Sequence, residues 1–130
     1  MKRLYPAFLL IMLASAHAHA LDPQVSAPGE HFEQREGENL FKAICQGCHM
    51  AEGQGAHGAG AYPALANNPR LSADAYPVFM VVQGQGGMPA FKNFLDDEQI
   101  AAVVTYIRTH NGNSFNEPVN MATVKALTGR

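Results

Sequence analysis

Charged residues are scarce in this chain, and clusters of basic residues are absent from it. Lys, Arg, Asp and Glu together make up 15% of the 130 residues, against 47% hydrophobic residues. This composition is too apolar for a disordered chain and predicts one compact domain. No Lys/Arg patch suggests a nucleic-acid partner, and the segment after Gly112 has no Lys/Arg run that would favour an anionic membrane surface.

An apolar run long enough to cross a membrane is also missing. Residues 4–16 are mainly apolar, but a spanning helix needs roughly 20 such residues. The run follows Lys2 and Arg3 and precedes Ala18-His19-Ala20, a small-x-small cleavage site. Residues 1–20 are therefore predicted to be a cleavable signal peptide for export to the periplasm, with an uncleaved anchor as the alternative. Cleavage leaves seven basic against eleven acidic residues, a formal charge of about −4, and no integral membrane segment in the mature chain.

Cysteine is limited to two residues, Cys45 and Cys48. A zinc site would need four ligands, and no second Cys or His pair at regular spacing follows. A disulfide is the ordinary expectation in an exported chain, but a redox-active one belongs in a βαβ setting that the sequence does not show. With His49 directly after Cys48, the spacing is typical of covalent haem attachment. Thiols at i and i+3 of a helix end each add to one haem vinyl group, and His49 then lies under the iron as an axial ligand.

The first of three predicted helices carries both cysteines. It begins near Glu36, whose negative charge suits a helix start, and its apolar face is formed by Leu40, Phe41, Ile44, Cys45 and Cys48. The stretch before it, residues 21–34, has no helical or strand period and is interpreted as a leader. Residues 50–69 hold four glycines and two prolines, which predicts a long loop. A long irregular loop in a small domain is usually functional.

The second and third predicted helices follow this loop. The second is capped by Ser72 and has Ala75, Phe79 and Val82 on its apolar face, while Pro77 predicts a late start or a kink. The third has the strongest signals, which are a capping box, a hydrophobic staple, a helical apolar period and a Gly stop. The residues that carry these signals are Leu95, Asp96, Gln99, Ile100, Val103, Val104, Ile107 and Asn111-Gly112. No segment shows strand alternation, so the predicted fold class is all-α.

The second axial ligand of the iron must come from a segment well downstream of His49. Met88 lies in the Gly-rich stretch 84–89, where glycines let the backbone approach the porphyrin and Pro89 stiffens the loop. A thioether is a soft donor that raises the haem potential. His57 is the alternative ligand, in which case Met88 is an ordinary loop methionine. With both axial positions filled, only the oxidation state of the iron can change, so the predicted activity is single-electron transfer.

Over residues 35–113 the chain resembles the class I, mono-haem bacterial cytochromes c. The matching features are Gly37, Phe41, the haem motif, Tyr62-Pro63-Ala64-Leu65, Gly87-Met88-Pro89-Ala90-Phe91 and Tyr106-Ile107. The resemblance implies three main helices and loops wrapped around one covalently bound haem c, with the first and last helices crossing near Gly37, Phe41 and Tyr106. It also implies that the Pro63 carbonyl accepts the proton of the free His49 ring nitrogen. Residues 114–130 are left as a polar tail, in which apolar positions favour an amphipathic turn or two at Val119, Met121, Val124 and Leu127.

More narrowly, residues 62–69 and 111–115 are similar to cytochrome subunits of periplasmic dehydrogenases. This similarity implies redox-protein partners, with a periplasmic dehydrogenase as electron donor and an oxidase or another cytochrome of the respiratory chain as acceptor. Such subunits often carry several haems, whereas this chain has one motif. Two other functions stay open at this point, namely a haem peroxidase with His57 in a distal role and a haem-based sensor in which Met88 dissociates. An electron carrier needs no catalytic residue.

Overall fold

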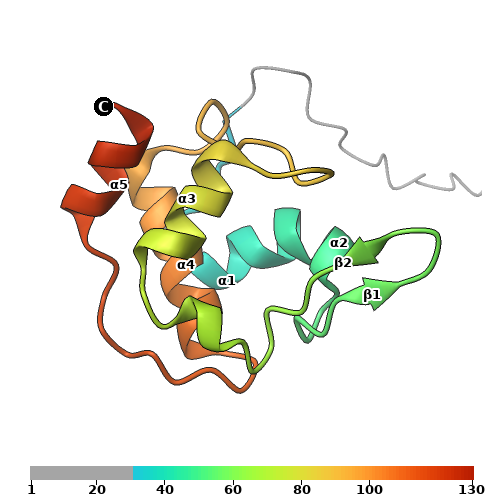
Figure 1. Cartoon of the computed structure of the whole chain (residues 1–130). Helices are drawn as coiled ribbons and strands as arrows, with labels where there is room; N and C mark the ends of the chain where they lie inside the picture. The colour runs from blue at the N-terminus through green and yellow to red at the C-terminus, as the bar shows by residue number, and fades with distance from the viewer. Residues whose placement is uncertain (1–30) are drawn as a thin grey trace, which may run out of the picture.

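The computed structural model describes residues 31–130, which form four helical segments and one small hairpin (Figure 1). The predicted signal peptide and most of the predicted leader lie outside the described residues. In order along the chain the elements are α1 (Gly37–Leu40), a π-helical turn (Phe41–Cys45), α2 (Gln46–His49), β1 (Ala56–His57), β2 (Ala61–Tyr62), a 3-10 turn (Pro69–Leu71), α3 (Ala75–Gln83), α4 (Asp97–Thr109) and α5 (Met121–Thr128). No helix within residues 31–130 is long and apolar enough to cross a membrane.

The predicted first helix is one continuous helical segment, because α1, the π-helical turn and α2 follow one another without a break. Leu40 and Phe41 are buried, as their place on the predicted apolar face requires. The π-helical turn ends at Cys45, so the wider helical winding includes the first cysteine of the haem motif. Such turns are rare and are frequently found at functional sites. The helix ends after His49, where Met50 adopts a φ of 67°.

The third predicted helix is confirmed as α4, including both bonds of its capping box. The Gln99 amide donates to Asp96 Oδ1 at 2.8 Å, and the Asp96 amide donates to Gln99 Oε1 at 2.9 Å. Burial alone would raise the pKa of Asp96, but the capping bond and the Arg35 guanidinium hold it below its ordinary value. Gln99 Nε2 also donates to the carbonyls of Phe32 at 2.5 Å and Gln34 at 2.8 Å. Residues 32–34, expected to be leader, are therefore tied to the start of α4.

Helices α1 and α4 cross at Gly37, as the resemblance implied. A Cβ at Gly37 would lie 2.2 Å from the Ala102 carbonyl oxygen and 2.8 Å from Tyr106 Cβ. One turn further on, the rings of Phe41 and Tyr106 pack with their centroids 5.4 Å apart and tilted by 43°. This crossing holds the first helical segment, which carries the cysteines, against α4, which forms the centre of the core.

Gly37→Ala should destabilise the fold because its methyl group would overlap backbone atoms of α4. Overpacking of this kind costs about 1–3 kcal/mol, which lowers the melting temperature by roughly 4–8 °C for each kcal/mol in a domain of this size. Thermal unfolding followed by circular dichroism measures the loss. Gly58→Ala is the matched control, because a Cβ there meets nothing within 4 Å, and its melting temperature should stay unchanged. Equal melting temperatures for the Gly37 variant and the wild-type protein would refute this close crossing.

The second predicted helix is confirmed as α3, but Ser72 does not cap it, and of the three residues predicted for its apolar face only Val82 is buried. Helix α3 begins at Ala75, and Ser72 instead ends the 3-10 turn before it. Pro77 therefore falls in the first turn, where its missing amide proton costs no helical hydrogen bond, so the late start that it predicted is confirmed. Ala75 is exposed and Phe79 is 46% exposed, whereas the buried residues are Pro77, Val78, Val81 and Val82. The segment is apolar on nearly every side, so its periodicity alone could not select the face.

The long loop after His49 contains the one pair of strands in residues 31–130, which the sequence did not predict. Strands β1 and β2 pair antiparallel, with Ala56 opposite Tyr62 and His57 opposite Ala61. Each strand has only two residues, too few for an alternating pattern to be visible. In Figure 1 this hairpin projects on the side of the molecule opposite α5.

The segment 114–130, expected to be a polar tail with an amphipathic turn or two, contains helix α5 and packs against α3 and α4 (Figure 1). Asn120 caps it by accepting from the Ala122 amide at 2.8 Å, and Val119 and Val124 are buried in the core. This adds a fourth helix to the three expected and makes residues 114–130 part of the packed structure.

Candidate functional site: an apolar cavity between the haem motif and Met88

Cys45 and Cys48 lie at the end of the first helix and line the same cavity. Cys45 is half-buried and Cys48 is exposed, and neither forms a disulfide. Burial, assisted by the neighbouring Cys48, raises the pKa of the Cys45 thiol to about 12. Because metals bind thiolates, a protonated Cys45 is a poor zinc ligand. Within residues 31–130 there is no group of three or more His, Cys, Asp or Glu side chains that could hold a metal ion.

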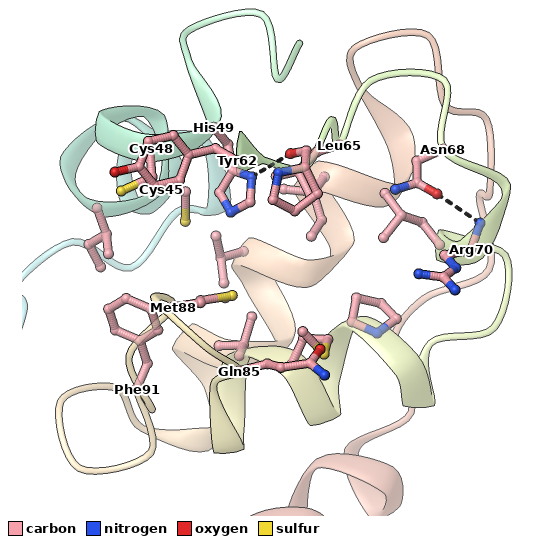
Figure 2. A pocket seen from close by; sticks show the side chains of 18 of the residues that line it. Cys45, Cys48, His49, Tyr62, Leu65, Asn68, Arg70, Gln85, Met88 and Phe91 are labelled. Atoms are coloured by element: carbon pink, nitrogen blue, oxygen red, sulfur yellow. Dashed lines mark hydrogen bonds between the residues drawn. The ribbon is translucent and has the colours of Figure 1, made fainter. Parts of the chain in front are cut away.

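His49 is buried and its ring is held in one orientation by the loop. Its Nδ1 lies 2.9 Å from the Pro63 carbonyl oxygen, directly after strand β2. A carbonyl oxygen can only accept, so Nδ1 carries the proton and Nε2 keeps its lone pair. Figure 2 shows this second ring nitrogen facing the cavity. The loop therefore leaves one imidazole nitrogen free to act as a metal ligand at the cavity wall.

Met88 closes a tight turn on the other side of the cavity. The amides and carbonyls of Gln85 and Met88 exchange two hydrogen bonds of 3.0 Å. Gly84 has a φ of 68°, and a Cβ on it would lie 2.4 Å from the Met88 carbonyl oxygen, so only glycine fits there. Figure 2 shows the Met88 thioether projecting into the space below His49. The Gly-rich stretch was predicted to let the backbone approach the porphyrin closely. It also holds the Met88 backbone in place.

The cavity between these side chains has a volume of about 350 Å³ and mainly apolar walls. Its walls include residues of the first helix, the 3-10 turn, α3 and α4, among them Ile44, Leu71, Val81, Val103 and Ile107. Two thiols, one imidazole nitrogen and the thioethers of Met80 and Met88 line it, and they include the donor set that a covalently attached haem needs. The residues present therefore fit a c-type haem.

Not every candidate from the sequence reaches this cavity. His57, the alternative ligand, is exposed in β1 and is not among the residues that line it. Met80, placed only on a helix by the sequence, does line it, as do Arg70 and Tyr76. No motif marked these three. Arg70 lies in the 3-10 turn before α3, and Tyr76 and Met80 lie on α3 itself.

Three features together define a class I cytochrome c. Two helices cross at a glycine, the first of these helices ends in a haem motif, and an apolar cavity faces that motif. Residues 32–107, more than half of the chain, match the family model described as cytochrome c oxidase, cbb3-type, subunit III. The chain belongs to this family of cytochrome c domains. Membership implies a c-type haem and supports electron transfer as the activity.

Two relatives of similar sequence agree with this assignment. The chain is 38% identical over 73 residues to cytochrome c6 from Leptolyngbya boryana, which covers 55% of this chain and 85% of that protein. It is 30% identical over 104 residues to the cytochrome c subunit of alcohol dehydrogenase (quinone) from Gluconobacter oxydans, which covers 70% of this chain but only 21% of that subunit. Among solved structures it is similar to cytochrome c6C from Synechococcus sp. PCC 7002, with 26% identity, a TM-score of 0.48 and coverage of 58% and 94%.

Proposed function

We propose that the chain is a mono-haem cytochrome c that carries single electrons. The observation that carries this proposal is the convergence of the Cys45, Cys48 and His49 side chains with Met88 on one apolar cavity. In this proposal Cys45 and Cys48 hold the haem through thioether bonds, and His49 and Met88 are the axial ligands of its iron. When bound, the haem supplies a reversible one-electron change at the iron.

The residues of the chain would hold and orient the haem for this one-electron change. The Pro63 carbonyl fixes the tautomer of His49 and orients its Nε2, which a ligating histidine needs. The Gln85–Met88 turn holds Met88 at the opposite side of the cavity, whose walls are mainly apolar. His49 and Met88 together would hold the iron of a bound haem without an open position for oxygen or peroxide, which favours an electron carrier over a peroxidase or a gas sensor.

We further propose that the protein works in the periplasm between a dehydrogenase and the respiratory chain. The predicted signal peptide at residues 1–20 supports export. The similarity to a dehydrogenase cytochrome subunit supports a periplasmic dehydrogenase as donor, and an oxidase or another cytochrome would be the acceptor. N-terminal sequencing of the mature protein from an exporting host should give a chain that starts at Leu21. An intact Met1 would contradict the cleavage.

Potentiometric titration of the purified, haem-loaded protein tests the central function. The expected result is one reversible transition that fits a single electron, with no carbon monoxide adduct of the reduced protein at neutral pH. Rapid turnover of hydrogen peroxide would instead indicate an enzyme, and ready binding of carbon monoxide would indicate a sensor. Two separate transitions would contradict a single haem.

A further inference from the structure

The Pro63 carbonyl that orients His49 lies in a segment with little packing of its own. Residues 63–68 lie outside every helix and strand, and none of them is buried. Leu65 is half-buried against the hydrophobic core, whereas Pro63 and Ala64 are exposed. A segment of this kind opens easily unless hydrogen bonds hold it, so the position of the Pro63 carbonyl depends on the bonds of the residues that follow it.

One buried side chain, that of Asn113, ties this segment to the end of α4. Its Nδ2 donates to the Leu65 carbonyl at 2.8 Å, and its Oδ1 accepts from the Asn68 amide at 2.9 Å. Nδ2 also donates to the Ile107 carbonyl in α4 at 2.8 Å. Both the donor and the acceptor of the Asn113 amide are therefore in use. Asn113 is 8% exposed, so water competes little for these bonds.

Other hydrogen bonds hold the same segment, but they do not replace Asn113. The Gly53 carbonyl accepts from the Leu65 amide at 2.7 Å, and Gly53 belongs to the loop that begins after the haem motif. The Asn67 amide donates to the Asn111 carbonyl at 3.1 Å. In the described part of the chain, Asn113 thus supplies two of the three hydrogen bonds that join residues 63–68 to α4 and the residues directly after it.

We propose that Asn113 is a positioning residue for the axial ligand His49, and that it acts through residues 63–68 and the Pro63 carbonyl. The proposal rests on the haem assigned above. A carbonyl oxygen held 2.9 Å from Nδ1 polarises the proton of that nitrogen, which raises the basicity of the ring as an iron ligand. A more basic ligand stabilises ferric iron, so Asn113 lowers the haem potential without touching the haem.

Asn113→Leu tests this proposal, because leucine has a similar size but forms no hydrogen bond through its side chain. In the reduced, haem-loaded protein, exchange of the His49 Nδ1 proton with water should become about tenfold faster or more, since the variant lacks two bonds that oppose local opening. The midpoint potential should rise. Nuclear magnetic resonance and potentiometry measure these two changes. Wild-type values of both in Asn113→Leu would overturn the proposal.

Asn120→Leu is the matched control for this substitution. Asn120 is exposed, and its side chain caps α5 by accepting from the Ala122 amide at 2.8 Å. The control also loses an asparagine hydrogen bond, but that bond does not involve residues 63–68. Exchange of the His49 Nδ1 proton and the potential should therefore keep their wild-type values. Changes in this control as large as those in Asn113→Leu would overturn the proposal.

A backbone amide on the Met88 side of the cavity separates positioning from a general loss of stability. The Phe91 amide donates to the Val81 carbonyl at 2.9 Å, shortly after the turn that carries Met88. In Asn113→Leu this amide should exchange at its wild-type rate while the His49 Nδ1 proton exchanges faster. Equal acceleration of the two protons would show that Asn113 only stabilises the fold, and the proposal would be wrong.

Hydrogen exchange in the wild-type protein keeps the test decisive where Asn113→Leu does not accumulate with haem. The Asn68 amide and the His49 Nδ1 proton should then exchange through one local opening, with the same dependence on low concentrations of denaturant. A different dependence for the two protons would overturn the proposal. A wild-type protein without haem would refute the proposed function itself, which is a separate and visible outcome.

Discussion

Met88→Ala is expected to lower the midpoint potential of the haem on the order of 0.1–0.3 V, a part of the roughly 0.8 V range that axial ligands span. The soft thioether stabilises ferrous iron, so its loss favours the ferric state. The variant should also lose the near-infrared charge-transfer band of thioether-ligated ferric haem, and its reduced form should bind carbon monoxide. Absorption spectroscopy and potentiometry measure these changes directly.

Met80→Leu is the matched control for this prediction, since Met80 is the other methionine that lines the cavity. It lies on α3, whereas Met88 is held by the turn that starts at Gln85. The control should keep the near-infrared band and most of the potential. Loss of the band in Met80→Leu with retention in Met88→Ala would show that the ligand has been assigned to the wrong methionine.

Arg108→Met is expected to cause the largest loss of stability of any single substitution considered for this chain. Arg108 is 2% exposed, and its guanidinium donates to the carbonyls of Leu71 at 2.9 Å, Ser72 at 3.0 Å and Glu117 at 2.5 Å. Methionine keeps much of the apolar stem but leaves three carbonyl groups without their donor. The bond to Leu71 is buried and the other two are partly buried; because an unsatisfied buried group costs about 1–3 kcal/mol, the free energy of unfolding should fall by about 3 kcal/mol.

Chemical denaturation of the haem-loaded protein measures this loss. Lys125→Met is the control, because Lys125 is exposed and its removal should change the unfolding free energy by less than about 0.5 kcal/mol. Arg108→Lys should fall between the two, because one ammonium group cannot reach all three carbonyls. If Arg108→Met were as stable as the wild-type protein, the three hydrogen bonds would not hold the loop before α3 and the segment before α5 on α4.

The elements with strong local signals were the ones that the sequence predicted well. Helix α4 combines a cap, a staple and a clear apolar period, and its capping box and buried face are both confirmed. Helix α3 has apolar residues on nearly every side, so its buried face depends on packing against α4 and α5, which a local pattern does not contain. The same holds for α5, whose place is set by contacts that join residues far apart in the chain, such as the hydrogen bond of the Asn120 amide to Asp74 Oδ2 at 2.8 Å.

The residues of the candidate site can be sorted in the same way, by whether a local sequence pattern marks them. The sequence predicted Cys45, Cys48 and His49 because covalent haem attachment needs a fixed local spacing, and Met88 because its glycines and proline form a local signal; all four line one cavity. The contact between His49 and Pro63 joins residues 14 positions apart and was suggested only by resemblance. Arg70 has no local signal at all, because its place at the cavity depends on the anchoring of residues 68–72 to α4 and the residues after it.

Mass spectrometry of the denatured mature protein, made in a host that attaches c-type haem, tests the central claim most directly. Denaturation releases a haem held only by its axial ligands, whereas thioether bonds at Cys45 and Cys48 survive it. The account predicts a chain from Leu21 to Arg130 carrying the mass of one haem, and loss of that mass in a Cys45→Ala, Cys48→Ala double variant. A colourless polypeptide with two free or mutually oxidised thiols would contradict it.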